Sequence, residues 1–330
     1  MNDARESGIN RAHLEAAVPN YKNYSIDIRD SDSLDRLFGE YQSDIALIVH
    51  AAAQPNPEWA ATDPFTDFTV NANGTLTLLE MCRQHCPEAV FVMPSTTKVY
   101  GDAPNYLPLV EQETRYEVAK EHPYYKHGID EQIGIDQTTH SLFGASKAAA
   151  DLLVQEYGRY FGLKTAVFRA SCLIGPNESL PQPYGFLSEL MKCALSGEEY
   201  TIFGYKGKQV RDTMHTLDFM NMIWHFYQQP RPGSVYNAGG GRFSNVSVLE
   251  AIGLCEEITG NRMNVTYSED NRIGDQVWWI TDCSRFINDY PEWGWEYNLQ
   301  DMLAQVLTAM VQEAQDATSQ ALKTGFSAKS

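Results

Sequence analysis

Short apolar runs alternate with amphipathic stretches along the first 170 residues of the chain. The apolar runs have the length and composition of buried parallel strands. They predict strands over Asn23–Ile28, Asp44–Ala53, Ala89–Ser95 and Thr165–Ser171. The amphipathic stretches predict helices over Ser31–Tyr41, from Pro64 through the GTLTLLEMCRQ segment, and over Phe143–Gly162. Asp63 before Pro64 is a typical helix start, with Asp as the N-cap and Pro in the first turn.

This alternation predicts an α/β fold with a doubly wound parallel sheet, because parallel strands are joined by right-handed helical crossovers. We expect residues 1–170 to form this Rossmann-type domain. After Gly175 the pattern loosens and prolines mark loops, which predicts a smaller mixed domain over 171–316 that partly returns to the sheet. Its predicted elements are a strand at Tyr200–Phe203 and helices near Phe186–Leu195, Val248–Thr259 and Leu299–Glu313. Residues 317–330 are polar and weakly patterned, and we expect a frayed tail.

Composition narrows the possible partners. The formal net charge is −18, which argues against nucleic acid or an anionic membrane as a partner. The six cysteines form neither a CxxC pair nor a cluster with histidine, so zinc, any other metal site and a disulfide framework are not expected. The polar first residues lack a secretory signal, and no apolar run approaches the ~20 residues of a membrane helix. We therefore expect a cytoplasmic protein.

Ligands of open parallel sheets bind beyond the carboxyl ends of the strands. The predicted strands lead into Asp27–Arg29, His50–Gln54, Pro94–Gly101 and Phe168–Pro176. Each of these segments taken alone is better explained as a loop. The PSTTKVYGD segment is richer, because Thr96, Thr97 and Lys98 place two hydroxyls and a charge directly after an apolar strand.

Further candidate groups lie downstream. Phe143 and Lys147 are four residues apart on a predicted helix, so they share a face. Such a pair is more often core packing beside a lysine that extends to solvent. Two cationic segments, one with Lys208, Arg211 and His215 and one with Arg272 and Asp275, are candidates for diphosphate binding. A salt-bridged loop is the simpler alternative for both.

Seven motifs occur together in a fixed order from about residue 20 to about 310. They are HAAAQ (50–54), NANGTLTLLE (71–80), STTKVYGD (95–102), FGASK (143–147), RASCLIGP (169–176), KQVRD (208–212) and RIGD (272–275). Their order and spacing resemble the extended short-chain dehydrogenase/reductase superfamily of NAD-dependent epimerases and dehydratases. Sugar 4,6-dehydratases of that family carry Asp-Glu where this chain has Thr97 and Lys98. The resemblance is greatest to the branch that inverts C2 of CDP-linked deoxyhexoses.

The resemblance implies an NAD-dependent nucleotide-sugar epimerase that works through a transient keto sugar, and a homodimer. The smaller domain would be mainly substrate-binding. The implied catalytic positions are Thr96, Phe143 and Lys147. The implied cofactor-binding residues are Asp27, Ile28, Ala51, Ala52, Gln54, Asn71, Lys147 and Ser171. The implied substrate-binding residues are Thr97, Lys98, Lys208, Arg211 and Arg272.

Two departures from the family pattern matter. No GxxGxxG turn occurs in the chain, so we expect that the N-terminal β-α-β unit of the Rossmann fold is missing, most simply by truncation. Phe143 stands where the family has the tyrosine general acid/base. A relocated base is one explanation, with Thr96, Lys98, His140 and Lys147 as open candidates. The alternatives are a catalytically impaired nucleotide-sugar-binding homologue, or another sugar-nucleotide epimerase or reductase of the superfamily.

Overall fold

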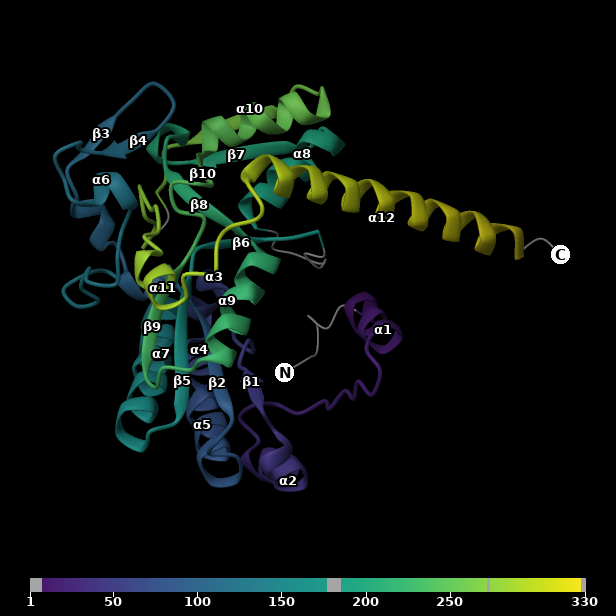
Figure 1. Cartoon of the computed structure of the whole chain (residues 1–330). Coiled ribbons are helices and arrows are strands. Elements are labelled where there is room, and N and C mark those ends of the chain that lie inside the picture. The colour runs from purple at the N-terminus through teal and green to yellow at the C-terminus, as the bar shows by residue number, and fades with distance from the viewer. Residues whose placement is uncertain (1–7, 177–184, 272–273, 328–330) are drawn as a thin grey trace.

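A parallel four-stranded sheet forms the centre of the protein (Figure 1). The computed structural model describes residues 8–176, 185–271 and 274–327. The strand order is β1-β2-β5-β9, with bounds Leu47–Val49, Val90–Thr96, Lys164–Ala170 and Ser234–Ala238. All three pairings are parallel, so the carboxyl ends of the four strands lie along one edge.

Helices cover both faces of this sheet. On one face α2 (Ser31–Tyr41), α5 (Gly74–His85) and α7 (Leu142–Phe161) bury a core that includes Phe91 and Met93 of β2. On the other face α9 (Thr216–Gln228) and α11 (Ser284–Asp289) pack on a core with Val92 and Phe168. Because side chains alternate along a strand, β2 supplies both cores. The predicted doubly wound α/β fold is confirmed.

Local capping explains where the helices begin and end. α2 begins at the predicted Ser31, and the Asp30 side chain accepts a hydrogen bond from the Ser33 amide. The helix predicted from Pro64 begins as α4 (Pro64–Phe68) with Asp63 as N-cap, and passes through a π-helical segment (Thr69–Asn73) into α5. α7 ends at Gly162, whose left-handed conformation (φ 72°) stops the helix.

The remaining strands form small sheets beside the central one. β6 (Cys172–Ile174), β8 (Val210–His215) and β10 (Asn245–Ser247) make one, and β7 (Glu199–Phe203) pairs with β11 (Asn264–Ser268). β3 (Leu109–Glu111) and β4 (Tyr116–Val118) form a short antiparallel pair. The helices α8 (Phe186–Ser196), α10 (Val248–Thr259) and α12 (Leu299–Ser327) share a third core. The shorter helices are α1 (Gly8–Ala17), α3 (Pro57–Thr62), α6 (Tyr124–His127), η1 (Gln42–Asp44), η3 (Thr97–Tyr100), η4 (Ala103–Tyr106) and η5 (Tyr205–Gly207).

Three sequence predictions are corrected. Asn23–Ile28 is not a strand: within the described residues β1 pairs only with β2, so this segment has no neighbouring strand with which to form a ladder. The strand predicted over Asp44–Ala53 is reduced to Leu47–Val49. The segment predicted as a frayed tail is helical as far as Ser327, where α12 ends (Figure 1), because it is rich in strong helix formers such as Ala, Gln and Leu. No helix in the described part of the chain is both long and apolar enough to cross a membrane.

Candidate active site

The carboxyl end of β2 lies directly against the first turn of α7. A Cβ atom added to Gly144 would lie 2.8 Å from the carbonyl oxygen of Lys98, so only glycine permits this approach of the two backbones. At the same end, Gly101 terminates η3 with a φ of 56°, a conformation that favours glycine. The sequence segments STTKVYGD and FGASK, some 40 residues apart, therefore form one site.

Lys147 reaches the end of β2 from α7. Its ammonium donates a hydrogen bond to the carbonyl oxygen of Pro94, 3.3 Å away, and only 7% of the residue is exposed. Phe143 lies one turn earlier on α7 and is equally buried. Burial lowers the pKa of Lys147 to about 8, although the carboxylates of Asp151 and Asp67 act in the opposite direction. A buried amine whose pKa is lowered in this way makes this position a candidate for a functional role.

Thr96 is the last residue of β2. Its hydroxyl oxygen accepts a hydrogen bond from the Lys98 amide at 3.2 Å, which leaves its own proton free to donate. Because side chains alternate along β2, Thr96 follows Pro94 on the face opposite α7. Thr96 and Lys147 thus share the edge of the sheet but reach it from opposite faces. A ligand lying beyond the strand ends is accessible to both.

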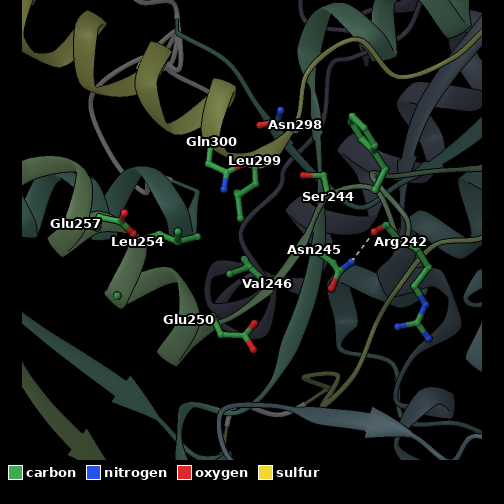
Figure 2. Close-up of a pocket in the computed structure, with 12 residues that line it drawn as sticks. Arg242, Ser244, Asn245, Val246, Glu250, Leu254, Glu257, Asn298, Leu299 and Gln300 are labelled. Atoms are coloured by element: carbon green, nitrogen blue, oxygen red, sulfur yellow. Dashed lines mark hydrogen bonds between the residues drawn. The ribbon is translucent and has the colours of Figure 1, made fainter.

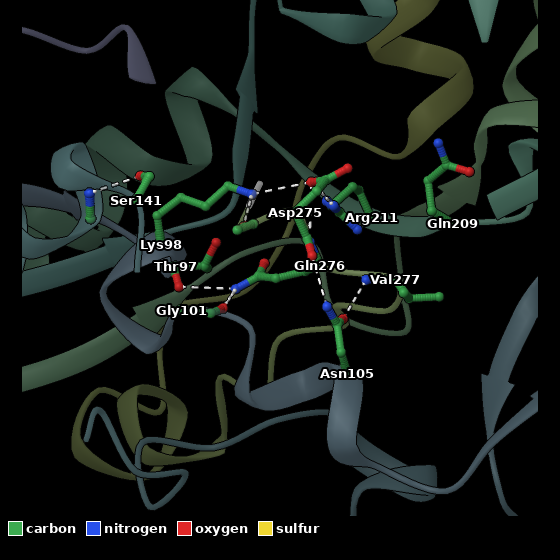
Figure 3. A network of polar contacts seen from close by, with 12 residues as sticks. Thr97, Lys98, Gly101, Asn105, Ser141, Gln209, Arg211, Asp275, Gln276 and Val277 are labelled. Atoms are coloured by element: carbon green, nitrogen blue, oxygen red, sulfur yellow. Dashed lines mark hydrogen bonds and ion pairs between the residues drawn. The ribbon is translucent and has the colours of Figure 1, made fainter. Parts of the chain in front are cut away.

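An ionic cluster joins β2 to β8 (Figure 3). Asp275 accepts hydrogen bonds from the Lys98 ammonium at 3.2 Å and from the Arg211 guanidinium at 2.6 Å. Burial alone would raise the pKa of Asp275, but Arg211 and Lys98 lower it to about 2. Two cations and one carboxylate leave a net positive charge, which suits an anionic ligand. In a chain with a net charge of −18 this local excess is notable.

Two residues that the sequence analysis missed hold this cluster in place. The buried side-chain amide of Gln276 donates to the carbonyl oxygens of Thr97 (3.2 Å) and Gly101 (3.0 Å). The side chain of Asn105 donates to the Asp275 carbonyl (2.8 Å) and accepts from the Val277 amide (2.7 Å), as Figure 3 shows. Neither residue belongs to a motif, and their partners lie at least 170 residues away in the sequence, so no local signal could have found them.

The segment after β1 is stabilised by an amide network. The Asn71 side chain accepts from the Gln54 amide (2.8 Å) and donates to the Gln54 carbonyl (3.1 Å), the Asp67 carboxylate (3.1 Å) and the Ser146 hydroxyl (2.9 Å). These bonds engage the whole amide of Asn71. Asn71 therefore positions the loop that carries exposed Ala51 and Ala52 and fastens it to α7.

Two buried polar atoms at the ends of β1 and β2 have no hydrogen-bond partner in the described part of the chain: His50 Nδ1 and Ser95 Oγ. His50 Nε2 lies 2.8 Å from the Thr75 hydroxyl, which itself donates to the Asn71 carbonyl, so Nε2 is the donor and Nδ1 a bare acceptor. Burial and the nearby Lys147 lower the pKa of His50 to about 3. Unpaired buried polar atoms at a strand end indicate a place for a polar ligand.

The other predicted cofactor residues are present but already engaged. Asp27 binds Arg29 through both carboxylate oxygens, and this contact lowers the pKa of Asp27 to about 2. Ile28 packs on α5 at Gly74, where a Cβ would lie 2.5 Å from its terminal methyl. The Ser171 hydroxyl donates hydrogen bonds to both the carboxylate and the backbone carbonyl of the buried Asp212.

Two predicted substrate residues are not brought into the cluster. Lys208 binds Glu111 (2.9 Å) and the Gln112 carbonyl (2.8 Å) instead of joining Lys98 and Arg211. Arg272 lies outside the described residues. Within the described ranges, no group of three His, Cys, Asp or Glu side chains is arranged to hold a metal ion.

A shallow hollow of about 510 Å³ lies elsewhere, over β10, α10 and the start of α12 (Figure 2). Asn245, Glu250, Leu254 and Gln300 are among its lining residues. It contains none of the residues predicted for catalysis or binding. We therefore place the candidate active site at the carboxyl edge of the central sheet, around Thr96, Lys147 and the Lys98–Asp275–Arg211 cluster.

The fold and this edge define a class: an α/β enzyme that binds a nucleotide beyond the ends of its parallel strands. A family model described as the NAD dependent epimerase/dehydratase family matches residues 2–239. The chain is 31% identical over 294 residues to CDP-paratose 2-epimerase from Salmonella typhi, and the aligned region covers 87% of this chain and 84% of that protein. It is 30% identical over 292 residues to dTDP-glucose 4,6-dehydratase from Salmonella typhimurium, covering 82% and 72%. The chain belongs to the NAD-dependent epimerase/dehydratase family.

Solved structures show the same fold. Pal from Bacillus thuringiensis superimposes with a TM-score of 0.76 at 21% identity, over 94% of this chain and 89% of that one. The NAD complex of UDP-glucose 4-epimerase from Thermus thermophilus gives a TM-score of 0.71 at 23% identity, over 88% and 86%. The resemblance seen in the motifs and the expected NAD cofactor are thus confirmed at family level.

The residues at the sheet edge fit one end of NAD. Within the described residues, Lys147 donates one N–H hydrogen to Pro94 and keeps others in either protonation state, and His50 Nδ1 and Ser95 Oγ are unpaired. Donors and acceptors therefore remain for the ribose hydroxyls of the nicotinamide half. The pyrophosphate end has no matching glycine-rich turn in this sequence.

Proposed function

We propose that this protein is a nucleotide-sugar epimerase that inverts C2 of a CDP-linked deoxyhexose through a transient keto sugar. The Lys98–Asp275–Arg211 cluster carries the proposal. Thr97 and Lys98 stand where the related dehydratases have an acidic pair after the catalytic threonine, so the acid for dehydration is lacking. The cluster adds the Arg211 guanidinium to the Lys98 ammonium, which suits an anionic substrate.

The roles of the side chains follow from their positions. NAD would take a hydride from the ring carbon and return it to the opposite face. Thr96 would donate its hydroxyl proton to the reacting sugar oxygen, and Lys147 would bind the nicotinamide ribose. Arg211, Lys98 and Arg272 would neutralise the diphosphate, with Thr97 and Lys208 at the margin of the substrate. Asp27, Ile28, Ala51, Ala52, Gln54, Asn71 and Ser171 would line the cofactor, directly or by holding its loops.

Phe143 favours a second candidate, a nucleotide-sugar-binding homologue with impaired catalysis, because its ring has no proton to exchange. A 4-epimerase or a reductase of the same family is a third. NAD and CDP-paratose incubated with the protein in D₂O, with the products examined by NMR, separates the three. Inversion at C2 supports the 2-epimerase, binding without conversion supports the impaired homologue, and inversion at C4 or reduction supports the third. Extensive deuterium at C2 would contradict hydride storage on the cofactor.

We also propose that a strand and a glycine-rich turn outside these 330 residues complete the NAD site beside β1. Two features support this. In the described structure, β1 pairs with one strand, β2, which leaves its other edge open. Helix α9 packs on the sheet face to which Leu47 of β1 also contributes, and besides the side chains that it buries there it exposes the apolar side chains of Leu217, Met220 and Trp224. NAD affinity measured with and without the coding sequence upstream of Met1 tests it. Equal affinity for the two proteins would contradict the proposal.

A homodimer is the proposed assembly. The helices corresponding to Pro64–Cys86 and Ala145–Phe161 expose apolar side chains that a partner copy would cover, among them Phe65 (86% exposed), Phe68, Leu152 and Tyr160 (81%). The position of these helices on one face of the sheet makes a twofold helix-to-helix contact possible.

A further inference from the structure

The structure bears on which group replaces the missing tyrosine. Phe143 is buried at the start of α7 with no titratable atom, so a hydroxyl proton of the substrate needs another acceptor. Of the four candidates that the sequence leaves open, Thr96 is an alcohol, and its oxygen already accepts from the Lys98 amide. An alcohol is too weak an acid–base group for this task near neutral pH.

His140 is also excluded as the acceptor. Its Nε2 lies 2.8 Å from the Val99 carbonyl and its Nδ1 lies 3.1 Å from the Thr138 carbonyl. Both nitrogens thus face hydrogen-bond acceptors, and neither presents a lone pair to a substrate. Burial lowers the pKa of Lys98 as well, but Lys98 has a counter-ion: the Asp275 carboxylate lies 3.2 Å from its ammonium and favours the charged form.

Lys147 differs from Lys98 in having no such partner. No carboxylate in the described structure lies within salt-bridge distance of its amine, which donates one long hydrogen bond to Pro94. The titratable groups that face it are Asp151 on α7, Asp67 on α4 and His50 after β1. Asp151 is held by two hydrogen bonds from Arg169, Asp67 accepts from Gln54 and Asn71, and His50 is neutral.

We infer that Lys147, in its neutral form, is the general base of this enzyme and takes the role that the tyrosine has in its relatives. The inference rests on the proposed function. NAD, when bound, would supply the acceptor for the hydride of the ring carbon. Lys147 would take the proton of the substrate hydroxyl on its lone pair as the O–H bond breaks and the carbonyl forms. When the carbonyl is reduced again from the other face, Lys147 would return the same proton to the sugar oxygen and so end each turnover neutral.

The surroundings suit both protonation states. Burial without a carboxylate partner favours the neutral amine, and its pKa of about 8 makes the neutral fraction substantial at ordinary pH. His50 Nδ1 and Ser95 Oγ offer unpaired acceptors on the α7 face of the sheet. Ser95 lies two residues after Met93, whose side chain packs on that face. His50 comes directly after Val49, which pairs with Val92 of the opposite face, so its side chain points to the α7 face. Both atoms can accept hydrogen bonds from the Lys147 ammonium that forms when the amine takes up the proton.

The first test separates charge from basicity. Lys147→Arg keeps N–H donors that can bind the ribose but cannot lose a proton. We expect kcat to fall on the order of 10²–10⁴-fold while NAD binding, measured by calorimetry, changes only a few-fold. The matched control is Lys164→Arg, whose lysine pairs with Glu88 on the surface. Unchanged kcat in Lys147→Arg would overturn the inference, and intact thermal unfolding shows that the variant has folded.

A second test does not need turnover. Reductive ¹³C-methylation of the full chain, followed by NMR titration, reports the protonation of each lysine, and Lys147→Arg assigns the Lys147 signal. Lys147 is expected to titrate near pH 8. Titration of Lys147 above pH 10 overturns the inference even if the protein is an epimerase. Titration near 8 with no epimerisation of any CDP-sugar contradicts the proposed function instead.

Restoring the phenol provides the last test. Phe143→Tyr is expected to raise the activity of the natural chain less than about tenfold, since a base is already present. In the Lys147→Arg background the same change should recover far more. A large gain in the natural chain and none in the Lys147→Arg background would contradict a lysine base.

Discussion

The Arg211 guanidinium donates a 2.6 Å hydrogen bond to the Asp275 carboxylate. Because Asp275 also accepts a hydrogen bond from the Lys98 ammonium, this carboxylate connects strand β8 to the end of β2. The bond forms between residues 64 positions apart, and both side chains are largely shielded from solvent. Arg211 is thereby oriented before any ligand arrives, which reduces the entropy lost on binding.

Arg211→Met should weaken the binding of CDP roughly ten- to hundredfold, because a charge-assisted contact contributes about 1.5–3 kcal/mol. Calorimetric titration with CDP measures the effect. Arg262→Met is the control, since the Arg262 side chain is 92% exposed and pairs with Glu256 on the surface. Equal CDP affinity in the two variants would contradict a diphosphate role for Arg211.

The pair Asp151–Arg169 should be the most sensitive ion pair of the fold. Its two 2.9 Å hydrogen bonds are almost fully buried between α7 and β5. Asp151→Asn leaves the guanidinium without its counter-charge and should lower the free energy of unfolding by about 3–5 kcal/mol in urea denaturation. Glu156→Gln, which removes the exposed partner of Arg159, should change it by less than about 1 kcal/mol. Similar changes in the free energy of unfolding for the two variants would show that burial does not determine how much an ion pair contributes to stability.

Lys147→Met should stabilise the protein at pH 7. In the folded protein the pKa of Lys147 is about 8, below its ordinary value of 10.5, so the folded state binds the proton more weakly than the unfolded state does. The destabilisation is complete below pH 8 and fades as the pH rises toward 10.5. We expect a gain on the order of 1–3 kcal/mol at pH 7 that shrinks at pH 10. A gain that is the same at both pH values would mean that packing, not charge, causes it.

A charge introduced on the exposed face of α4 should prevent dimerisation. Phe65→Glu is expected to yield a monomer by light scattering coupled to gel filtration, because burying an unpaired carboxylate at the interface is unfavourable. Tyr106→Glu changes a comparably exposed aromatic residue away from these helices and should leave the dimer intact. Dimers of undiminished stability for Phe65→Glu would place the interface elsewhere.

Much of the fold could be predicted from sequence because its signals are local. The period of apolar residues predicted β2, β5, α2 and α7, and the Asp63–Pro64 pair predicted where α4 begins, since capping and burial patterns act within a few residues. Asn23–Ile28 shows the limit of this reasoning. The segment has the composition of a strand, but a strand exists only where another strand pairs with it, and that is a property of the assembled sheet.

The sequence by itself determined the family, through seven motifs in order, and the set of residue types available at the sheet edge. Only the tertiary structure decided how those residues act. It paired Lys98 with Asp275, kept Lys208 away from that cluster, fastened the segment with Gln276 and Asn105, and left Lys147 without a carboxylate partner. The physical reason is that the protonation and orientation of a side chain depend on burial and on its nearest charges, and these come from segments remote in the chain.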